Sequence, residues 1–271
     1  MKRARYKHTI LFGTGNLYAA GSADHKEGQF EPDVANVYED WHLIPSSRPT
    51  IAMPGIETKF VTIPGMDGSL DLSEYLRNGR PAYGDRSGSF EFTVENDFDD
   101  GARNEEFWMT IYPKIVNTLH GKRFKMVLKE DDPDYYWEGR FTVDKYDPGD
   151  GYHSVVSISY ALKPFKRRIR TVLEKQIWDN FNFEKDYDYD PWDLANINVV
   201  NRRSLDIWGD GYPFQIEVTG KSGSVNVTFG GETQTVEAGY TKKIGHAAYG
   251  MQRIGLSGNG TISINWRGGS L

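Results

Sequence analysis

Hydrophobic and polar residues alternate with a period of two along most of the chain, a pattern typical of strands that bury one face. The alternation covers 90–94, 137–143, 156–162, 214–218, 225–229 and 262–266. Within 90–94, for example, Phe90, Phe92 and Val94 alternate with Glu91 and Thr93. The sequence therefore predicts a mainly β protein.

Two turns join neighbouring strands of this pattern. The cluster Asp147-Pro-Gly-Asp-Gly151 is rich in turn residues, so 136–162 is predicted to form one long hairpin. Gly230 and Gly231 follow Phe229 directly, and glycine tolerates the positive φ that a two-residue hairpin turn needs.

One segment has helical periodicity instead. Between 102 and 120, large hydrophobic residues recur at every fourth position and predict the buried stripe of an amphipathic helix: Phe107, Ile111, Ile115 and Leu119. Asp99 or Asp100 could cap its start, and Gly121 could end it in the left-handed conformation. Pro113 lies inside the pattern and is expected to kink or split the helix. A helix covering a sheet is favoured over any cofactor role.

A change in composition suggests two domains, at about 150 residues per domain. The basic run Lys163-Pro-Phe-Lys-Arg-Arg-Ile-Arg170 is followed by the acidic, aromatic stretch 184–193. We therefore predict an N-terminal β-sandwich domain with the helix over 1–166 and a C-terminal β-sandwich over 167–271, including a charged linker over 163–193. Residues 166–170 are expected to be exposed and to be the first tryptic target.

Charge and composition exclude several classes of protein. The net charge is −6, which disfavours a dedicated nucleic-acid binder. With no cysteine, the chain has no disulfide, thiolate zinc site, iron–sulfur cluster or thiol nucleophile. The basic N-terminus resembles the start of a signal peptide, but the stretch after it is interrupted by polar residues. No apolar run is long enough for a membrane span, and the protein is expected to be soluble and made in a cytoplasm.

Candidate metal and phosphate motifs are incomplete. Asp186, Asp188 and Asp190 have the spacing of the first ligands of a calcium loop, but Pro191 stands where that loop needs glycine and Ile197 where it needs glutamate. Gly220-Lys-Ser222 looks like the end of a phosphate-binding loop without its upstream glycine, and the alternation around it predicts a strand end and turn. We expect neither a metal nor a cofactor.

Catalytic constellations are equally weak. No Gly-x-Ser-x-Gly elbow is present, and the six histidines form no H-x-x-x-H pair. A glycosidase with two catalytic carboxylates is not excluded, because the separation of two acids in space is not visible in a sequence. Tryptophans in the C-terminal part would suit either sugar stacking or core filling: Trp178, Trp192, Trp208 and Trp266.

Several segments resemble the distal tail protein (Dit) family of siphophages that infect Gram-positive bacteria. The resemblance runs through 36–49 and 62–74, then through Asn117-Thr-Leu-His-Gly-Lys122 and Tyr135-Tyr-Trp-Glu-Gly-Arg-Phe141. It covers roughly residues 30–165. The positions that carry it are Trp41, Pro45, Arg48, Pro49, Pro64, Gly65, Asp67, Gly68, Leu70, Asp71, His120, Gly121, Lys122, Gly139 and Arg140. Within 63–70, a connection from strand to turn is favoured over a ligand loop.

The resemblance implies a structural, non-enzymatic virion protein. Its N-terminal β-sandwich with one helix would assemble into a homohexameric ring at the distal end of the tail tube. The C-terminal β-sandwich would resemble galactose-binding or carbohydrate-binding modules and lie outside the ring. The implied partners are the tail tube protein, the tape-measure protein, the tail-associated or tip protein and a receptor-binding protein, with a saccharide as a further ligand of the C-terminal domain.

Two hypotheses therefore compete. One is a hub of the tail tip or baseplate that takes part in host attachment without chemistry of its own. The other is a carbohydrate-binding module or glycosidase acting on cell-wall polysaccharide. The role of the first 35 residues stays open in both.

Overall fold

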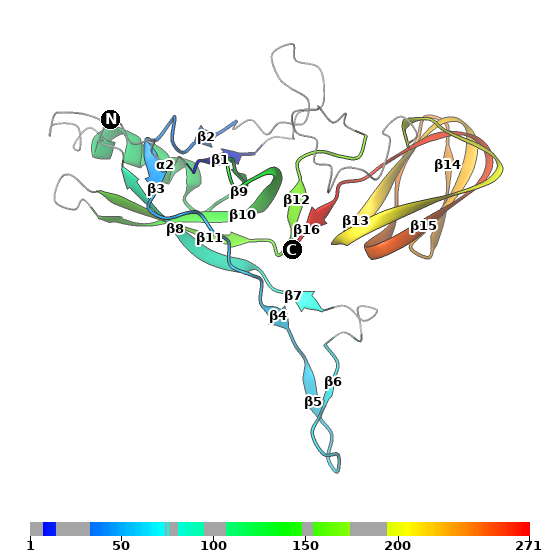
Figure 1. The fold of residues 1–271 in the computed structure, drawn as a ribbon, viewed down its shortest axis with the longest axis horizontal. Helices are drawn as coiled ribbons and strands as arrows, with labels where there is room; N and C mark the ends of the chain where they lie inside the picture. Colours follow the sequence, from blue (N-terminus) through cyan, green and yellow to red (C-terminus); the bar gives the residue numbers. More distant parts are fainter. Residues whose placement is uncertain are drawn as a thin grey trace. The chain divides into compact units, whose positions relative to one another are not determined.

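The computed structural model is mainly β with one short helical segment, and its described residues form two compact units. Unit 1 extends to Lys166, and unit 2 runs from Arg167 to Leu271 (Figure 1). The structure describes residues 8–14, 33–73, 75, 81–94, 107–147, 154–173 and 194–271. The predicted fold class, mainly β with one amphipathic helix, is confirmed.

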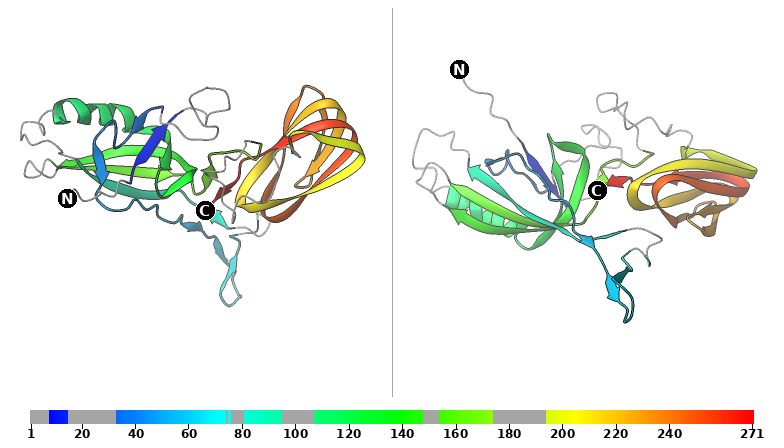
Figure 2. Two further views of the ribbon diagram at one scale, coloured as in Figure 1. Left: turned by 45° about the horizontal axis from the view of Figure 1, so that its top comes forward. Right: turned by 60° about the horizontal axis from the view of Figure 1, so that its bottom comes forward.

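Unit 1 is built on an antiparallel sheet whose main path has the order β2-β1-β9-β10-β11-β8-β3. The sheet is curved (Figure 2). Its strands are β1 (Ile10–Gly13), β2 (Ala35–Asn36), β3 (Leu43–Pro45), β8 (Arg86–Val94), β9 (Lys122–Leu128), β10 (Asp132–Asp147) and β11 (Val155–Leu162). β10 and β11 pair from Gly139↔Leu162 to Asp147↔Val155, so the predicted long hairpin is confirmed. Residues 148–153 of its turn lie outside the described part.

The alternating hydrophobic side chains of these strands form the core of unit 1. Phe90, Phe92 and Val94 are buried, as are the residues that alternate along β11: Val156, Ile158, Tyr160 and Leu162. Phe12 lies at the centre, with its ring 4.9 Å from that of Phe141 in an edge-on arrangement. The period-two pattern therefore identified the buried face correctly.

The helical segment packs against β9 and β10 and begins as a π-helical turn. η2 (Phe107–Ile111) passes directly into α2 (Tyr112–Leu119), with Pro113 in the first turn of α2. Because proline lacks an N–H, it is tolerated there. The helical segment divides beside Pro113 into a π-helical and an α-helical part, where the sequence predicted a kink or split. Phe107, Ile115 and Leu119 are buried, whereas Ile111 is half-buried. Gly121 has φ +72° and confirms the predicted helix end, while Asp99 and Asp100 lie outside the described residues.

A narrow arm projects from the sheet of unit 1 (Figures 1 and 2). Its base is the pair β4 (Ile56–Glu57) and β7 (Ala82–Tyr83), and its outer part is the hairpin of β5 (Phe60–Thr62) and β6 (Ser69–Asp71). The two pairs form separate two-stranded sheets. We use "the arm" for residues 53–73.

Unit 2 is a strongly curled antiparallel sheet of β13 (Ile197–Phe229), β14 (Glu232–Glu237) and β15 (Thr241–Asn265). The first leg of β13 pairs with β15 from Ile197↔Ile262 to Asp210↔Tyr249. After a break in register, its second leg pairs with two stretches of β15 and with β14. The inward side chains of all three strands share one core, which includes the predicted alternating residues of 214–218, 225–229 and 262–266.

Two glycine features of unit 2 bear on the sequence predictions. Gly230 and Gly231 have φ +59° and +82° between Phe229 and Glu232, so the predicted two-residue turn is confirmed. The predicted strand end at Gly220-Lys-Ser222 is wrong, because β13 continues through it with a shift of register. A Cβ on Gly220 would lie 2.1 Å from the Glu237 carbonyl oxygen, and this close approach explains the glycine.

The predicted exposure of 166–170 is also wrong. β12 (Lys166–Arg168) is half-buried, and Ile169 is only 2% exposed. The Arg168 N–H donates to the Gly268 carbonyl, next to β16 (Gly269–Ser270), and the Arg267 guanidinium donates to the Arg168 carbonyl. The basic run is therefore held by backbone pairing, while the linker residues 174–193 and the aspartates at 186–190 lie outside the described part.

Candidate functional site

The residues that carry the family resemblance fall into separate places in unit 1. One group gathers where α2 ends. The His120 N–H donates to the Val116 carbonyl and the Gly121 N–H to the Phe141 carbonyl, 2.8 Å away. The ammonium of Lys122 donates to the Asn117 carbonyl at 2.5 Å, and Arg140 donates to the Gly121 carbonyl. These cations satisfy carbonyls at the helix C-terminus, where the helix dipole favours positive charge.

Gly139 supports the same corner by allowing close backbone approach. A Cβ at this position would lie 2.2 Å from the Ala161 carbonyl oxygen and 2.7 Å from the Leu162 Cα. Such contacts do not occur in folded proteins, so any larger residue would separate β10 from β11. The role of Gly139 in this structure is therefore packing.

A second group lies in the core and at the sheet edge. Trp41 is 4% exposed, with its ring 6.2 Å from that of Phe12. Pro45 ends the edge strand β3 opposite Phe92, a position that proline accepts because an edge strand leaves some N–H groups unpaired. Pro49 is buried in the segment that follows. These residues also stabilise the fold and present no reactive group.

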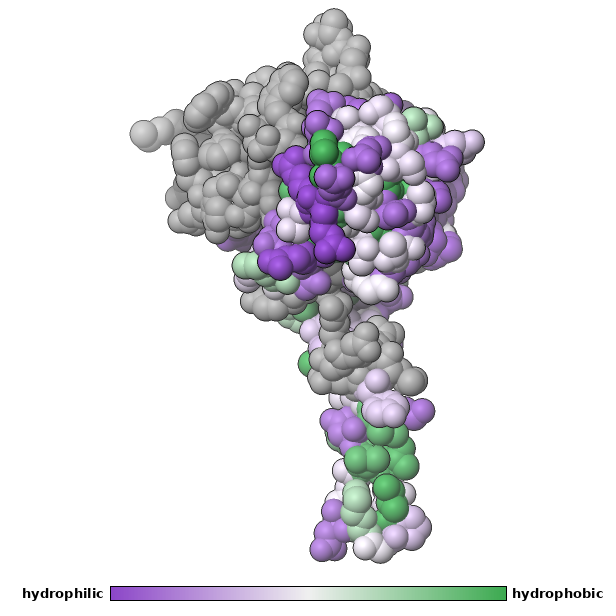
Figure 3. Space-filling view, turned by 90° about the vertical axis from the view of Figure 1, so that its right-hand side faces the viewer, coloured by the Kyte–Doolittle hydropathy of each residue, from purple (hydrophilic) through white to green (hydrophobic). Residues whose placement is uncertain are grey.

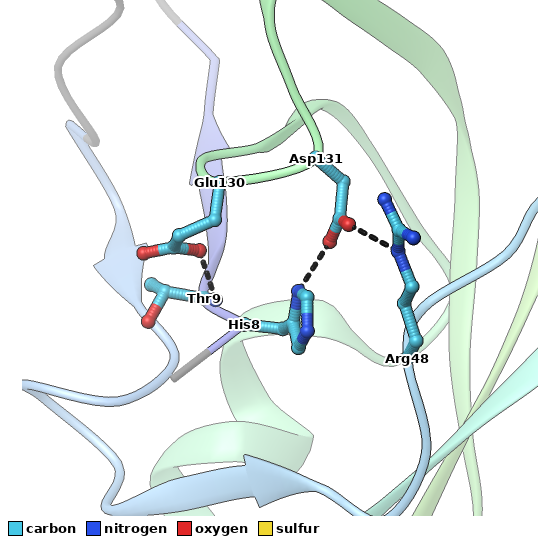
Figure 4. A network of polar contacts seen from close by, with 5 residues as sticks. All are labelled: His8, Thr9, Arg48, Glu130 and Asp131. Atoms are coloured by element: carbon cyan, nitrogen blue, oxygen red, sulfur yellow. Dashed lines mark hydrogen bonds and ion pairs between the residues drawn. The ribbon is translucent and has the colours of Figure 1, made fainter. Parts of the chain in front are cut away.

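Arg48 belongs to a polar network that the sequence did not reveal (Figure 4). Its Nε donates to Asp131 at 2.6 Å, and His8 Nδ1 lies 2.6 Å from the other oxygen of the same carboxylate. The Thr9 N–H donates to Glu130 at 2.5 Å. The network fixes the residues before β1, and the loop after β3, to the turn between β9 and β10.

The third group forms the tip and outer strands of the arm. Gly65 and Gly68 have φ +85° and +83°, so the connection from strand to turn predicted for 63–70 is confirmed. Pro64 and Asp67 lie in this turn, and Leu70 and Asp71 lie on β6. Two hydrogen bonds hold the pKa of Asp71 below its usual value: the Ser73 hydroxyl has the larger effect and the Ser73 N–H the smaller one.

A buried cation stands at the base of the arm. Arg86 is 2% exposed, and its guanidinium lies over the Trp137 ring. Its Nε donates to the Pro164 carbonyl at 2.7 Å, and its Nη1 donates to the Ala52 carbonyl at 2.8 Å. Burial lowers the pKa of its guanidinium. Arg86 therefore anchors the segment that leads into the arm, and nothing in its local sequence signals this role.

Unit 2 presents an exposed aromatic side chain beside an ion pair. The Arg253 guanidinium, on β15, donates two hydrogen bonds of 2.7 and 3.1 Å to the Asp206 carboxylate, on β13. This contact lowers the pKa of Asp206 and raises that of Arg253. Trp208, two residues along the same strand from Asp206, is 45% exposed and stands opposite Met251.

These groups do not converge on one reactive centre. Among the described residues, no cluster of three or more histidine, aspartate or glutamate side chains could hold a metal ion. The helices in the described part include none long and apolar enough to cross a membrane. The features the sequence missed, namely the His8–Asp131 contact, the buried Arg86 and the exposed arm, depend on tertiary placement.

Of three comparisons with known proteins, the comparison with solved structures finds a similar architecture. No protein-family model matches the sequence, and no curated protein matches it. Among solved structures, the chain is similar to the crystal structure of SPP1 Dit (gp 19.1), described as a paradigm of the hub adsorption apparatus in phages that infect Gram-positive bacteria. The TM-score is 0.55 at 12% identity, and the match covers 98% of this chain and 100% of that one. The chain therefore has a Dit-like fold.

Proposed function

We propose that the chain is a structural hub protein of a phage tail. Six copies would form a ring at the distal end of the tail tube and link the tube to the tail tip or baseplate adhesion apparatus. The observation that carries this proposal is the fold likeness to a hub protein over nearly the full length of both chains. The chain would be made in the host cytoplasm and reside in the virion.

The roles of the motif residues support a structural function. Those at the helix end cap α2, Gly139 allows close strand packing, and Trp41 fills the core. None of these positions holds a pair of groups poised for proton transfer or nucleophilic attack. The partners proposed for such a hub are the tail tube protein, the tape-measure protein, the tail-associated or tip protein and a receptor-binding protein.

Three carboxyl groups of the described residues differ from the general acid of a glycosidase. A general acid in that reaction needs a raised pKa. Hydrogen bonds shift Asp71, Asp206 and Glu232 in the opposite direction, toward lower pKa values. None of these three groups therefore has the raised pKa of that acid, and we propose a non-enzymatic role on the fold likeness to a hub protein.

Electron microscopy of the purified full chain tests the ring. Negative-stain images should show particles with six-fold symmetry, and light scattering should give about 185 kDa for six chains of 30.8 kDa. A stable dimer at every concentration, with no ring in the images, would contradict the proposal.

A second candidate function is saccharide binding by unit 2. The exposed Trp208 could stack on a sugar ring, and the Asp206–Arg253 pair beside it offers polar groups to hydroxyls. A glycan array probed with the full chain tests this function, with Trp208→Ala as the variant and Tyr240→Ala, also exposed in unit 2, as the control. Signal that disappears in the first variant and persists in the second would support it, whereas equal signal from both would refute it.

A further inference from the structure

The arm exposes more hydrophobic surface than its own chain can cover. Every residue from Gly55 to Asp71 is exposed. Seven large apolar side chains lie along the arm and its approach: Met53 (80% exposed), Ile56 (61%), Phe60 (58%), Val61 (37%), Ile63 (40%), Met66 (41%) and Leu70 (42%). Figure 3 shows this hydrophobic surface running along the projecting arm. Phe60 and Val61 are neighbours on one strand and point to opposite faces, so both faces of the ribbon are uncovered.

An isolated two-stranded hairpin is only marginally stable in water, so a ribbon of this kind gains stability from a surface laid against it. The seven side chains together expose on the order of 700 Å², at about 200 Å² for a large side chain. A standard protein interface buries about 800 Å² on each partner. The arm therefore has the size and the apolar character of one side of a stable interface.

The charges of the arm indicate which surface could form the other side of this interface. The arm carries three carboxylates, Glu57, Asp67 and Asp71, against the single ammonium of Lys59. At the end of α2, unit 1 exposes three cations that we call the helix-end cluster: Lys122, Arg123 and Arg140.

Arg123 and Arg140 stand directly opposite each other on β9 and β10, an arrangement of like charges that destabilises a sheet. No carboxylate within the described ranges forms an ion pair with either arginine. An acidic partner laid over them would relieve this repulsion.

We infer that the arm of one copy of this chain packs against the helix-end cluster of a second copy. The inference rests on the proposed hub function, for which it supplies the contact between subunits. An arm and an acceptor at different places on the same chain make a head-to-tail contact, and such a contact closes into a ring when the rotation between copies allows it. The apolar ribbon supplies the buried area, and the acidic residues fix its direction across the cluster.

Loss of apolar surface from the arm tests the contact. We compare the full chain with the double variant Phe60→Ser/Leu70→Ser by light scattering over a dilution series. Both side chains are more than 40% exposed, so the variant should fold normally. The concentration at half-assembly should rise at least about tenfold. Val200→Ser, which removes a side chain 64% exposed in unit 2, is the matched control and should assemble as the wild type does.

Charge reversal tests the acceptor. Asp67→Lys and Arg123→Glu should each weaken assembly, and the two changes combined in one chain should restore it in part, because each arm then meets the opposite charge on its neighbour. Assembly of Phe60→Ser/Leu70→Ser at the wild-type concentration would overturn the arm as the contact. If the combined variant assembled no better than the two single variants, the helix-end cluster would not be the acceptor of the arm.

The experiments distinguish a failure of the contact between copies from a failure of the proposed hub function. A wild-type chain that stays at 30.8 kDa at every concentration overturns the contact between copies. If antibody still labelled the distal end of the tail in that case, the hub function would stand without it. Rings formed equally well by the arm variants would leave the hub function intact and refute only the role of the arm.

Discussion

Replacing Ile115 by alanine should destabilise unit 1 by about 3 kcal/mol and leave unit 2 unchanged. Ile115 is 0% exposed and lies on α2 within the core of unit 1. The change removes three carbons, worth about 0.8 kcal/mol for each buried methylene, and the cavity left behind raises the loss into the range of about 2–5 kcal/mol seen for such truncations. A domain is stable by only about 5–15 kcal/mol, so the effect is readily measured.

Hydrogen exchange with mass spectrometry is the suitable assay, because peptides report on each unit separately. The most protected peptides of β9, β10 and β11 should lose protection equivalent to about 3 kcal/mol, while those of β13 and β15 stay as in the wild type. Met109→Ala is the matched control: Met109 is 77% exposed on η2, and its loss should cost less than about 0.5 kcal/mol. An Ile115→Ala chain that loses less than about 1 kcal/mol, or that loses protection equally in both units, would refute the packing described for α2.

Three further predictions address other elements. Gly139→Ala should destabilise unit 1 by about 1–3 kcal/mol, measured by the same exchange assay, because its Cβ would meet the Ala161 carbonyl oxygen. Gly55→Ala is the control, because a Cβ at this exposed glycine has no atom within 4 Å and the backbone has no positive φ. The pKa of Asp206 should lie below the usual aspartate range, so this residue stabilises the fold above its pKa in the unfolded chain and loses that effect as the pH falls through its pKa in the folded chain. In Arg253→Ala, carboxyl NMR should show the pKa of Asp206 rising toward its ordinary value. Brief trypsin digestion of the folded chain should leave the bonds after Arg167 and Arg168 intact, because β12 is paired; an early fragment ending at either residue would contradict that pairing.

The elements that the sequence predicted well are those with a local signal. Period-two alternation identified the buried faces of β8 and β11, and the fourfold spacing of hydrophobic residues identified α2. Gly121 and the Gly230-Gly231 turn were recognisable because positive φ favours glycine wherever the rest of the chain lies. In each case, the information is contained within a few neighbouring residues.

The features that escaped prediction depend on contacts between distant segments. His8 and Asp131 are 123 residues apart, and nothing near either one indicates their contact. The basic run at 166–170 suggested an exposed linker, but pairing with the segment before β16 half-buries it. Nothing in the local sequence of Phe60 and Leu70 indicates that they lie on a projecting ribbon, where the structure exposes both side chains. Burial at such positions is decided by tertiary structure, or by a partner.

The location of the chain in the phage particle is the most direct test of the central claim. Antibodies raised against the full chain, carrying gold particles, should label the distal end of the tail in electron micrographs of intact virions. Label confined to that end is the predicted result. Label along the tail tube or on the capsid, or virions that contain no copy of the chain, would contradict its assignment as a tail hub.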